Sequence, residues 1–73
     1  GLTIDEALPA VDKYLDDAFL SSLNQIRIIH GKGTGALREA VQAQLRSHPH
    51  VKSFRLADPN QGGSGVTVVE LEH

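Results

Sequence analysis

Between residues 26 and 38 the chain passes from a β-branched run, through three closely spaced glycines, into a stretch with helical periodicity. The run Ile26-Arg27-Ile28-Ile29 is typical of a strand that is covered on at least one face. After the glycines, apolar positions recur at three and four residues, which predicts a helix capped by Thr34 and ended by Pro49. Its inward positions are Leu37, Ala40, Val41, Gln44 and Leu45. A strand joined to a helix by so short a turn favours an α/β fold.

A second helix is predicted at the beginning of the chain. The spacing of Thr3 and Glu6 predicts its start, because the Thr3 hydroxyl can accept the Glu6 amide while the Glu6 carboxylate reaches back to the Thr3 amide. Pro9 lies past the first turn, where it removes a backbone donor, so we expect a local kink there. One apolar stripe faces the core and consists of Ile4, Ala7, Leu8, Val11, Leu15, Ala18 and Phe19.

Residues 51–57 and 66–69 are predicted to be strands, separated by a polar, glycine-rich loop at 58–65. The order helix, strand, helix, strand, strand predicts a two-layer α/β sandwich with two helices on a small mixed sheet. We expect the first two strands to be parallel through a right-handed crossover, and the last two to form a hairpin. Because three strands make a thin core, a further strand immediately upstream is expected.

Length and composition limit the class of protein. The 73 residues are 40% hydrophobic and support one domain, which we place at residues 1–71. No cysteine is present, which excludes disulfides and thiolate metal sites, and no apolar run approaches a membrane span. We therefore expect a soluble domain. Three aromatic residues are too few for an aromatic base-stacking sheet.

The ends of the chain carry two further expectations. The chain begins with Gly1 and contains no methionine, so we expect it to be part of a larger protein. Its last residues, Leu71-Glu72-His73, match the start of a common vector-derived tail. For this reason, Glu72 and His73 enter no functional hypothesis.

The charge is unevenly distributed along the chain. The net charge is −2, but residues 27–55 carry six lysines and arginines against a single glutamate. This basic middle third indicates either a surface for a polyanion or a set of solvated faces.

The glycine-rich turn is the strongest candidate site. A strand, a glycine turn and a helix start direct free backbone amides and the positive helix end at an anion, for which phosphate is the natural choice. Gly31, Gly33 and Gly35 allow close backbone approach, and Lys32 adds a positive charge. Arg38 in the first helical turn opposes the helix dipole, which a bound anion would explain. The spacing fits neither the Walker loop nor the dinucleotide fingerprint, so we expect no nucleotide cofactor.

Several polar residues have competing interpretations. His30, where the strand meets the glycine turn, is the best candidate acid or base, although it could simply bond a local backbone carbonyl. Lys32 could be an ordinary solvated lysine. His48 and His50 lack a third metal ligand at motif spacing, so favourable charge near a helix end is preferred. Asp12 and Asp16, one turn apart, could share a divalent ion, but solvation is the preferred interpretation.

The segment His-Gly-Lys-Gly-Thr-Gly-Ala-Leu-Arg at residues 30–38 resembles the signature of the Smr domain, the small MutS-related module. Residues 51–55 and 62–71 resemble the form at the C-terminal end of bacterial MutS2 proteins. The resemblance implies a nucleic-acid module, reported in the family as a nicking or structure-directed endonuclease on DNA and as an RNA-cleaving or ribosome-associated element. It also implies a bacterial, cytoplasmic parent chain with an ATPase part, linked to suppressing recombination and rescuing stalled ribosomes. The family's front motif, Leu-Asp-Leu-Arg-Gly on a first strand, is represented here only by Gly1.

The resemblance leads to a specific hypothesis of phosphodiester cleavage. His30 and Lys32 are the predicted catalytic residues, with His30 moving a proton and Lys32 holding the phosphate. The predicted phosphate and nucleic-acid contacts are Gly31, Gly33, Thr34, Gly35 and Arg38. Mg²⁺ or Mn²⁺ could activate water, although no protein ligands for the ion are apparent. The rival hypothesis is a module that binds branched nucleic acid or the ribosome and cuts nothing.

Overall fold

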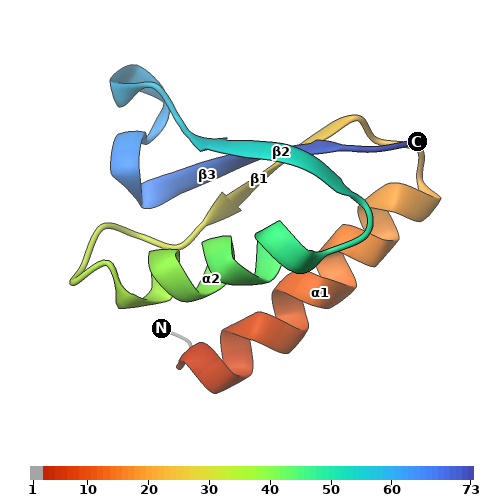
Figure 1. Cartoon of the computed structure of the whole chain (residues 1–73). Helices are drawn as coiled ribbons and strands as arrows, with labels where there is room; N and C mark the ends of the chain where they lie inside the picture. Colours follow the sequence, from red (N-terminus) through yellow and green to blue (C-terminus); the bar gives the residue numbers. More distant parts are fainter. Residues whose placement is uncertain (1–2) are drawn as a thin grey trace.

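The computed structural model describes residues 3–73 (Figure 1). Gly1, the expected remnant of the front motif, lies outside the described residues. The longer elements are α1 (Ile4–Leu20), β1 (Gln25–Ile29), α2 (Ala36–Ser47), β2 (Val51–Leu56) and β3 (Val66–Leu71). The predicted loop between the last two strands contains two short 3₁₀ helices, η1 (Pro59–Gln61) and η2 (Gly63–Gly65). No helix among residues 3–73 combines the length and apolarity needed to cross a membrane.

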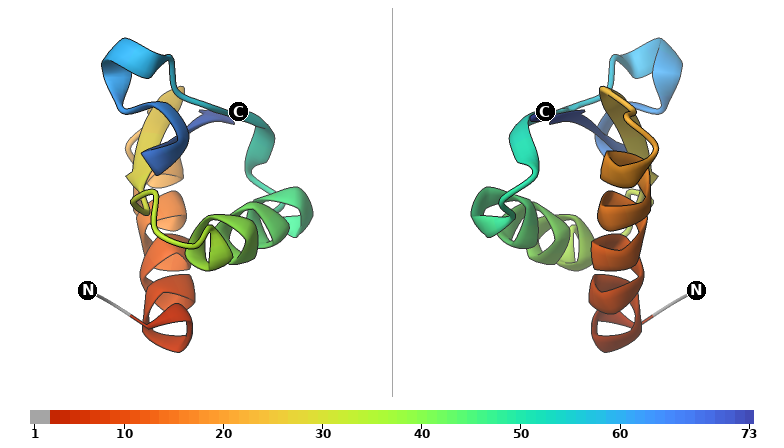
Figure 2. Two further views of the ribbon diagram at one scale, coloured as in Figure 1. Left: turned by 90° about the vertical axis from the view of Figure 1, so that its left-hand side faces the viewer. Right: turned by 90° about the vertical axis from the view of Figure 1, so that its right-hand side faces the viewer.

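Helix α1 begins with the predicted capping box. The Glu6 amide donates to Thr3 Oγ1 at 3.3 Å, and the Thr3 amide donates to Glu6 Oε1 at 3.1 Å. These bonds hold the pKa of Glu6 below its ordinary value. Their stabilising effect is therefore present above the ordinary pKa and is lost as the pH falls through the lowered one. The helix continues through Pro9 to Leu20 without interruption (Figure 2).

The sheet has the order β1-β3-β2, and both neighbouring pairs are antiparallel. The two-layer sandwich and the β2–β3 hairpin are confirmed. The expected parallel direction of β1 and β2 is confirmed, since both pair antiparallel with β3. The predicted mixed sheet is wrong, because β3 lies between these two strands and every neighbouring pair is antiparallel. Burial explains this order, because residues 66–69 of β3 are all buried whereas β2 has no buried residue. The strand that is apolar on both faces occupies the centre, and the mixed strand takes an edge.

Both helices lie on one side of the sheet (Figure 2). The core between the two layers includes Leu15 of α1, Val41 and Leu45 of α2, and Ile26, Ile28 and Val69 of the sheet. Leu37, Ala40 and Gln44, the other predicted inward positions of α2, are half-buried. A smaller cluster of Ala57, Val66 and Val68 lies apart from this core. Val66 and Val68 of this cluster point to the other face of the sheet, because successive side chains of a strand point to opposite faces.

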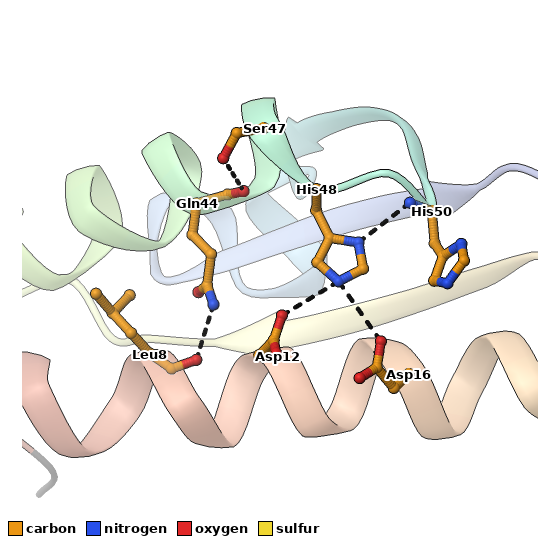
Figure 3. A network of polar contacts seen from close by, with 7 residues as sticks. All are labelled: Leu8, Asp12, Asp16, Gln44, Ser47, His48 and His50. Atoms are coloured by element: carbon orange, nitrogen blue, oxygen red, sulfur yellow. Dashed lines mark hydrogen bonds and ion pairs between the residues drawn. The ribbon is translucent and has the colours of Figure 1, made fainter.

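A polar network joins the two helices (Figure 3). His48 Nε2 lies 3.2 Å from an oxygen of Asp12 and 3.7 Å from one of Asp16, while its Nδ1 accepts the His50 amide at 3.1 Å. Since Nδ1 accepts, Nε2 carries the hydrogen and donates it to Asp12. The side chains of Asp12 and Asp16 are 56% and 53% exposed, in agreement with the preferred interpretation of a solvated pair, and His48 is the C-cap of α2, at the helix end. The sequence did not predict that the buried His48 side chain would contact both carboxylates across the helix interface.

Candidate functional site

The glycine-rich turn connects the end of β1 with the start of α2. Helix α2 begins at Ala36, and its N-cap is Gly35, which has a φ of +86°. Glycine adopts this left-handed conformation without strain. The predicted N-cap, Thr34, is therefore wrong by one residue, because the observed N-cap is Gly35. The Thr34 hydroxyl still accepts the Ala36 amide at 3.3 Å. Thr34 thus supports the helix start from just outside it.

Gly65, at the end of η2, holds the turn in place. The amides of His30 and Gly31 both donate to the Gly65 carbonyl, at 3.1 and 3.0 Å. A Cβ at position 65 would lie 3.4 Å from Cγ of Lys32, so the lysine stem rests against this glycine. The segment before β3 therefore positions both the glycine turn and the stem of its lysine.

Positive charge converges on the beginning of α2. The Arg38 guanidinium folds back over Gly35, since a Cβ at position 35 would lie only 2.7 Å from Nη2 of Arg38. Within residues 3–73 the amides of Gly33 and Gly35 donate to no protein acceptor, and the first amides of a helix have no partner inside it. Free amides, a guanidinium and the positive helix end thus share one location, an arrangement suited to an anion.

His30 is held by two hydrogen bonds. Its Nδ1 lies 3.0 Å from the carbonyl oxygen of Gly31, and its Nε2 lies 2.7 Å from Oγ1 of Thr67. A carbonyl only accepts, so Nδ1 carries the hydrogen in the neutral ring, and Nε2 accepts the Thr67 hydroxyl. The contact with a local backbone carbonyl is therefore present, and the two contacts together fix the ring orientation at the edge of the glycine turn.

Two residues of this site, Thr67 and Gly65, were not predicted from the sequence. Thr67 is fully buried, and it is the buried polar residue of the described core. The sequence did contain a signal for Thr67, because it is a hydroxyl residue in the middle of an apolar strand. It lies two residues before Val69, on the same face of the strand. Nothing in the spacing indicated that this hydroxyl would meet His30, which lies 37 residues earlier.

The structure places the predicted site residues together in one turn. His30, Lys32, Arg38 and the intervening glycines all lie between the end of β1 and the first turn of α2, with the Lys32 side chain in solvent. No three His, Cys, Asp or Glu side chains within residues 3–73 are placed to hold a metal ion. The residues of the turn therefore fit an anion and do not fit a cation held by protein ligands.

A cleft of about 430 Å³ extends from the turn along β1. Its walls are formed by α1, β1 and the start of α2, and His30, Tyr14, Ile29 and Leu37 are among the residues that line it. Among the described strands, β1 pairs only with β3, so the cleft follows the unpaired edge of the sheet.

Comparison with known proteins gives a consistent assignment. The family model described as Smr domain matches residues 1–72. The Endonuclease MutS2 of Pelotomaculum thermopropionicum is 61% identical over 71 residues, which are 97% of this chain and 9% of that protein. The Endonuclease MutS2 of Lachnospira eligens is 54% identical over 72 residues, again 9% of its length. The chain thus spans about a tenth of the length of these curated relatives.

Two solved structures share the fold. The crystal structure of the Smr domain of Thermus thermophilus MutS2 matches with a TM-score of 0.98 and 51% identity, covering 100% of this chain and 91% of that one. YdaL, a stand-alone small MutS-related protein from Escherichia coli, matches with a TM-score of 0.78 and 30% identity, covering 84% of this chain and 51% of that one. Because both sequence and fold agree over nearly its whole length, the chain belongs to the Smr domain family.

Proposed function

We propose that this Smr domain is a nuclease domain that cleaves phosphodiester bonds in DNA or RNA. The observation that carries the proposal is the placement of His30 at the glycine turn, beside Lys32 and the free amides at the start of α2. The relatives' shared name, Endonuclease MutS2, supports the same class of activity.

In this proposal the turn binds the phosphate that reacts. The free amides, Lys32 and Arg38 neutralise the charge that develops on its oxygens in the transition state. A hydroxyl from water, or the 2′-hydroxyl of RNA, replaces the Thr67 hydroxyl at Nε2 of His30. His30 takes the proton of that hydroxyl as its oxygen attacks phosphorus. The bond between phosphorus and the leaving oxygen breaks, and the leaving oxygen takes a proton from a solvent water molecule, while the protonated His30 later returns its proton to solvent. The Gly31 carbonyl keeps its bond to Nδ1 throughout and stabilises the charged ring.

The participation of Mg²⁺ or Mn²⁺ is a separate question for experiment. Because residues 3–73 offer no set of three metal-binding side chains, the proposed mechanism assigns roles only to protein groups. Cleavage of end-labelled branched DNA and stem-loop RNA, with either ion and with EDTA, tests the nuclease proposal and the metal requirement together. Absence of cutting on both substrates under all three conditions would contradict the proposal.

One observation favours the alternative of a binding module that cuts nothing. Both ring nitrogens of His30 are already bonded within the domain, as expected for a structural histidine. In that case salt-sensitive binding of branched nucleic acid or the ribosome persists in the assay without cleavage. A domain that only binds other proteins would have no salt-sensitive affinity for nucleic acid.

We further propose that the domain acts in a bacterial, cytoplasmic MutS2-like parent chain. The relatives are many times longer than this chain, which leaves room for an ATPase part. Suppression of recombination and rescue of stalled ribosomes are the two roles proposed for that parent. Preference for branched DNA in the cleavage assay supports the first, and preference for RNA supports the second.

Replacing Lys32 by glutamine is expected to weaken nucleic-acid binding several-fold. Loss of one phosphate contact should also reduce the slope of log affinity against log salt by about 0.7 to 0.9. Fluorescence anisotropy over a salt series measures both quantities. Lys13→Gln is the matched control, because Lys13 lies on α1 and pairs with Asp17 at 2.9 Å. Equal effects of the two substitutions would mean that Lys32 is an ordinary solvated lysine.

Replacing Thr67 by valine is expected to slow cleavage about tenfold to a hundredfold while leaving binding almost unchanged. Valine keeps the shape of threonine but cannot donate to Nε2. The ring therefore loses the contact that orients it before the attacking hydroxyl takes the place of Thr67, and small errors in geometry cost rate. Thr67→Ser, which keeps the hydroxyl, should restore most of the rate. Single-turnover cleavage, together with the NMR signals of the His30 ring, separates this positioning role from loss of fold. A serine variant as slow as the valine variant would contradict it.

A further inference from the structure

One side of the sheet is covered by neither helix (Figures 1 and 2). We call this side the outer face. Ile28 and Val69 point into the helix-covered core, so their strand neighbours Arg27 and Val68 point to the outer face. Arg27 pairs with Val68, and Val68 pairs with Arg55 on the opposite side. One row across three strands therefore reads arginine, valine, arginine.

Val68 and the two arginines differ in their exposure. Val68, which clusters with Ala57 and Val66, is only 3% exposed, whereas Arg27 and Arg55 are both exposed. Long cationic side chains cover apolar neighbours with their methylene stems and keep their charged ends in water. In this row two exposed arginines therefore flank a buried valine.

Neither guanidinium is neutralised within the described part of the chain. No carboxylate of residues 3–73 forms an ion pair with Arg27 or Arg55. Glu70, an acidic residue of β3, accepts a hydrogen bond from Nε2 of Gln25 at 2.7 Å. Arg27 donates from Nη2 to Oε1 of Gln61 at 3.3 Å, so η1 orients this guanidinium. The outer face thus holds two positive charges without an ion-pair partner in residues 3–73, and one of them, on Arg27, is oriented by a hydrogen bond.

We propose that the outer face is a second phosphate-contacting surface, on which Arg27 and Arg55 bind the backbone of the nucleic acid held at the glycine turn. Guanidinium groups bind phosphate through two parallel hydrogen bonds, which complements the unpaired charge of the row. Two strand spacings separate the arginine Cα atoms by about 9.5 Å, and three strand residues place Arg27 about 10 Å before His30. The row and the turn therefore contact different phosphates. This inference rests on the proposed function only in taking nucleic acid as the partner.

Binding measurements on the variant Arg27→Gln/Arg55→Gln test the proposal, since glutamine keeps part of each stem over Val68. The salt slope should fall by about 1.4 to 1.8, as expected for two lost phosphate contacts, and affinity should fall at least tenfold. The cleavage rate at saturating substrate should stay unchanged, because the reacting phosphate lies elsewhere. The control is Lys13→Gln/Arg46→Gln, which removes the same charge from the helices, where Arg46 lies over the Phe54 ring. Thermal unfolding of both variants confirms that the fold is retained.

The outcomes separate this inference from the proposed function. If the unsubstituted domain binds neither branched DNA nor stem-loop RNA, the proposed function fails and the outer-face inference fails with it. The other outcome is that the unsubstituted domain binds nucleic acid, but Arg27→Gln/Arg55→Gln has the same salt slope as Lys13→Gln/Arg46→Gln. In that case only the outer-face inference is overturned. NMR of the unsubstituted domain with a short oligonucleotide gives a second readout. Shifted amides at Arg27, Val68 and Arg55 support the surface, and shifts confined to residues 30–38 overturn it.

Discussion

His30→Ala is expected to abolish cleavage while most nucleic-acid affinity remains. The substitution removes Nε2, the proposed proton acceptor, and proton transfer by a positioned side chain contributes about 10² to 10⁴ in rate. Lys32, Arg38 and the free amides remain in place, so the phosphate is still bound. The measurement is single-turnover cleavage of branched DNA and stem-loop RNA, with anisotropy as the binding readout.

The control for His30→Ala must distinguish lost chemistry from lost structure. His30→Ala also leaves the buried Thr67 hydroxyl without its partner, which costs roughly 1 to 3 kcal/mol of stability. The comparison variant is His50→Ala, which removes a histidine stacked on Phe19 far along the chain from the turn. Both variants should be compared below their unfolding temperatures. A folded His30→Ala domain that cleaves at the original rate would move the proton transfer to another group and favour His30 as a structural residue.

Leu15→Ala is expected to bring the domain close to global unfolding. Leu15 is 0% exposed at the centre of the core, where leucine-to-alanine substitutions cost about 2 to 5 kcal/mol. A domain of this size has a total stability of roughly 4 to 11 kcal/mol, and no disulfide adds to it. The unfolding midpoint should fall by roughly 8 to 40 °C, at about 4 to 8 °C per kcal/mol for a domain of this size. Thermal unfolding followed by circular dichroism measures this shift.

Leu20→Ala provides the matched control within the same helix. Leu20 is 79% exposed at the end of α1, so its removal opens no cavity and should change stability by less than about 0.5 kcal/mol. Equal shifts for the two variants would mean that Leu15 does not lie in a packed core. The contrast therefore tests the packing of α1 on the sheet.

The sequence predicted most of the local structure because local rules decide it. The capping box located the start of α1, and the apolar stripe correctly gave its buried residues Ala7, Val11, Leu15 and Ala18. Ile4, the first residue of that stripe, is exposed in the first turn of the helix, so its predicted burial is wrong. The glycine turn was predicted from three glycines at fixed spacing, each of which has a positive φ. Proximity in sequence also kept His30, Lys32 and Arg38 together, so the candidate site could be read from one segment.

Other features required the fold because they join segments that are distant in sequence. The position of β3 between β1 and β2 depends on which strand buries both of its faces. The structure shows that β3 does so, whereas β2 contains no buried residue. The bridge from His48 to Asp12 and Asp16 joins residues more than thirty positions apart. Hydrophobic periodicity indicates which face of an element is buried but not which element covers it.

The amino-acid sequence by itself determined the elements, the two-layer class, the glycine turn and the family resemblance, because each depends on residues close together in the chain. Only the tertiary structure decided that Thr67 and Gly65 hold His30 and the turn, and that Arg27 and Arg55 flank Val68 on the outer face. These pairings depend on strand order and register, which are set by the packing of the whole sheet against both helices.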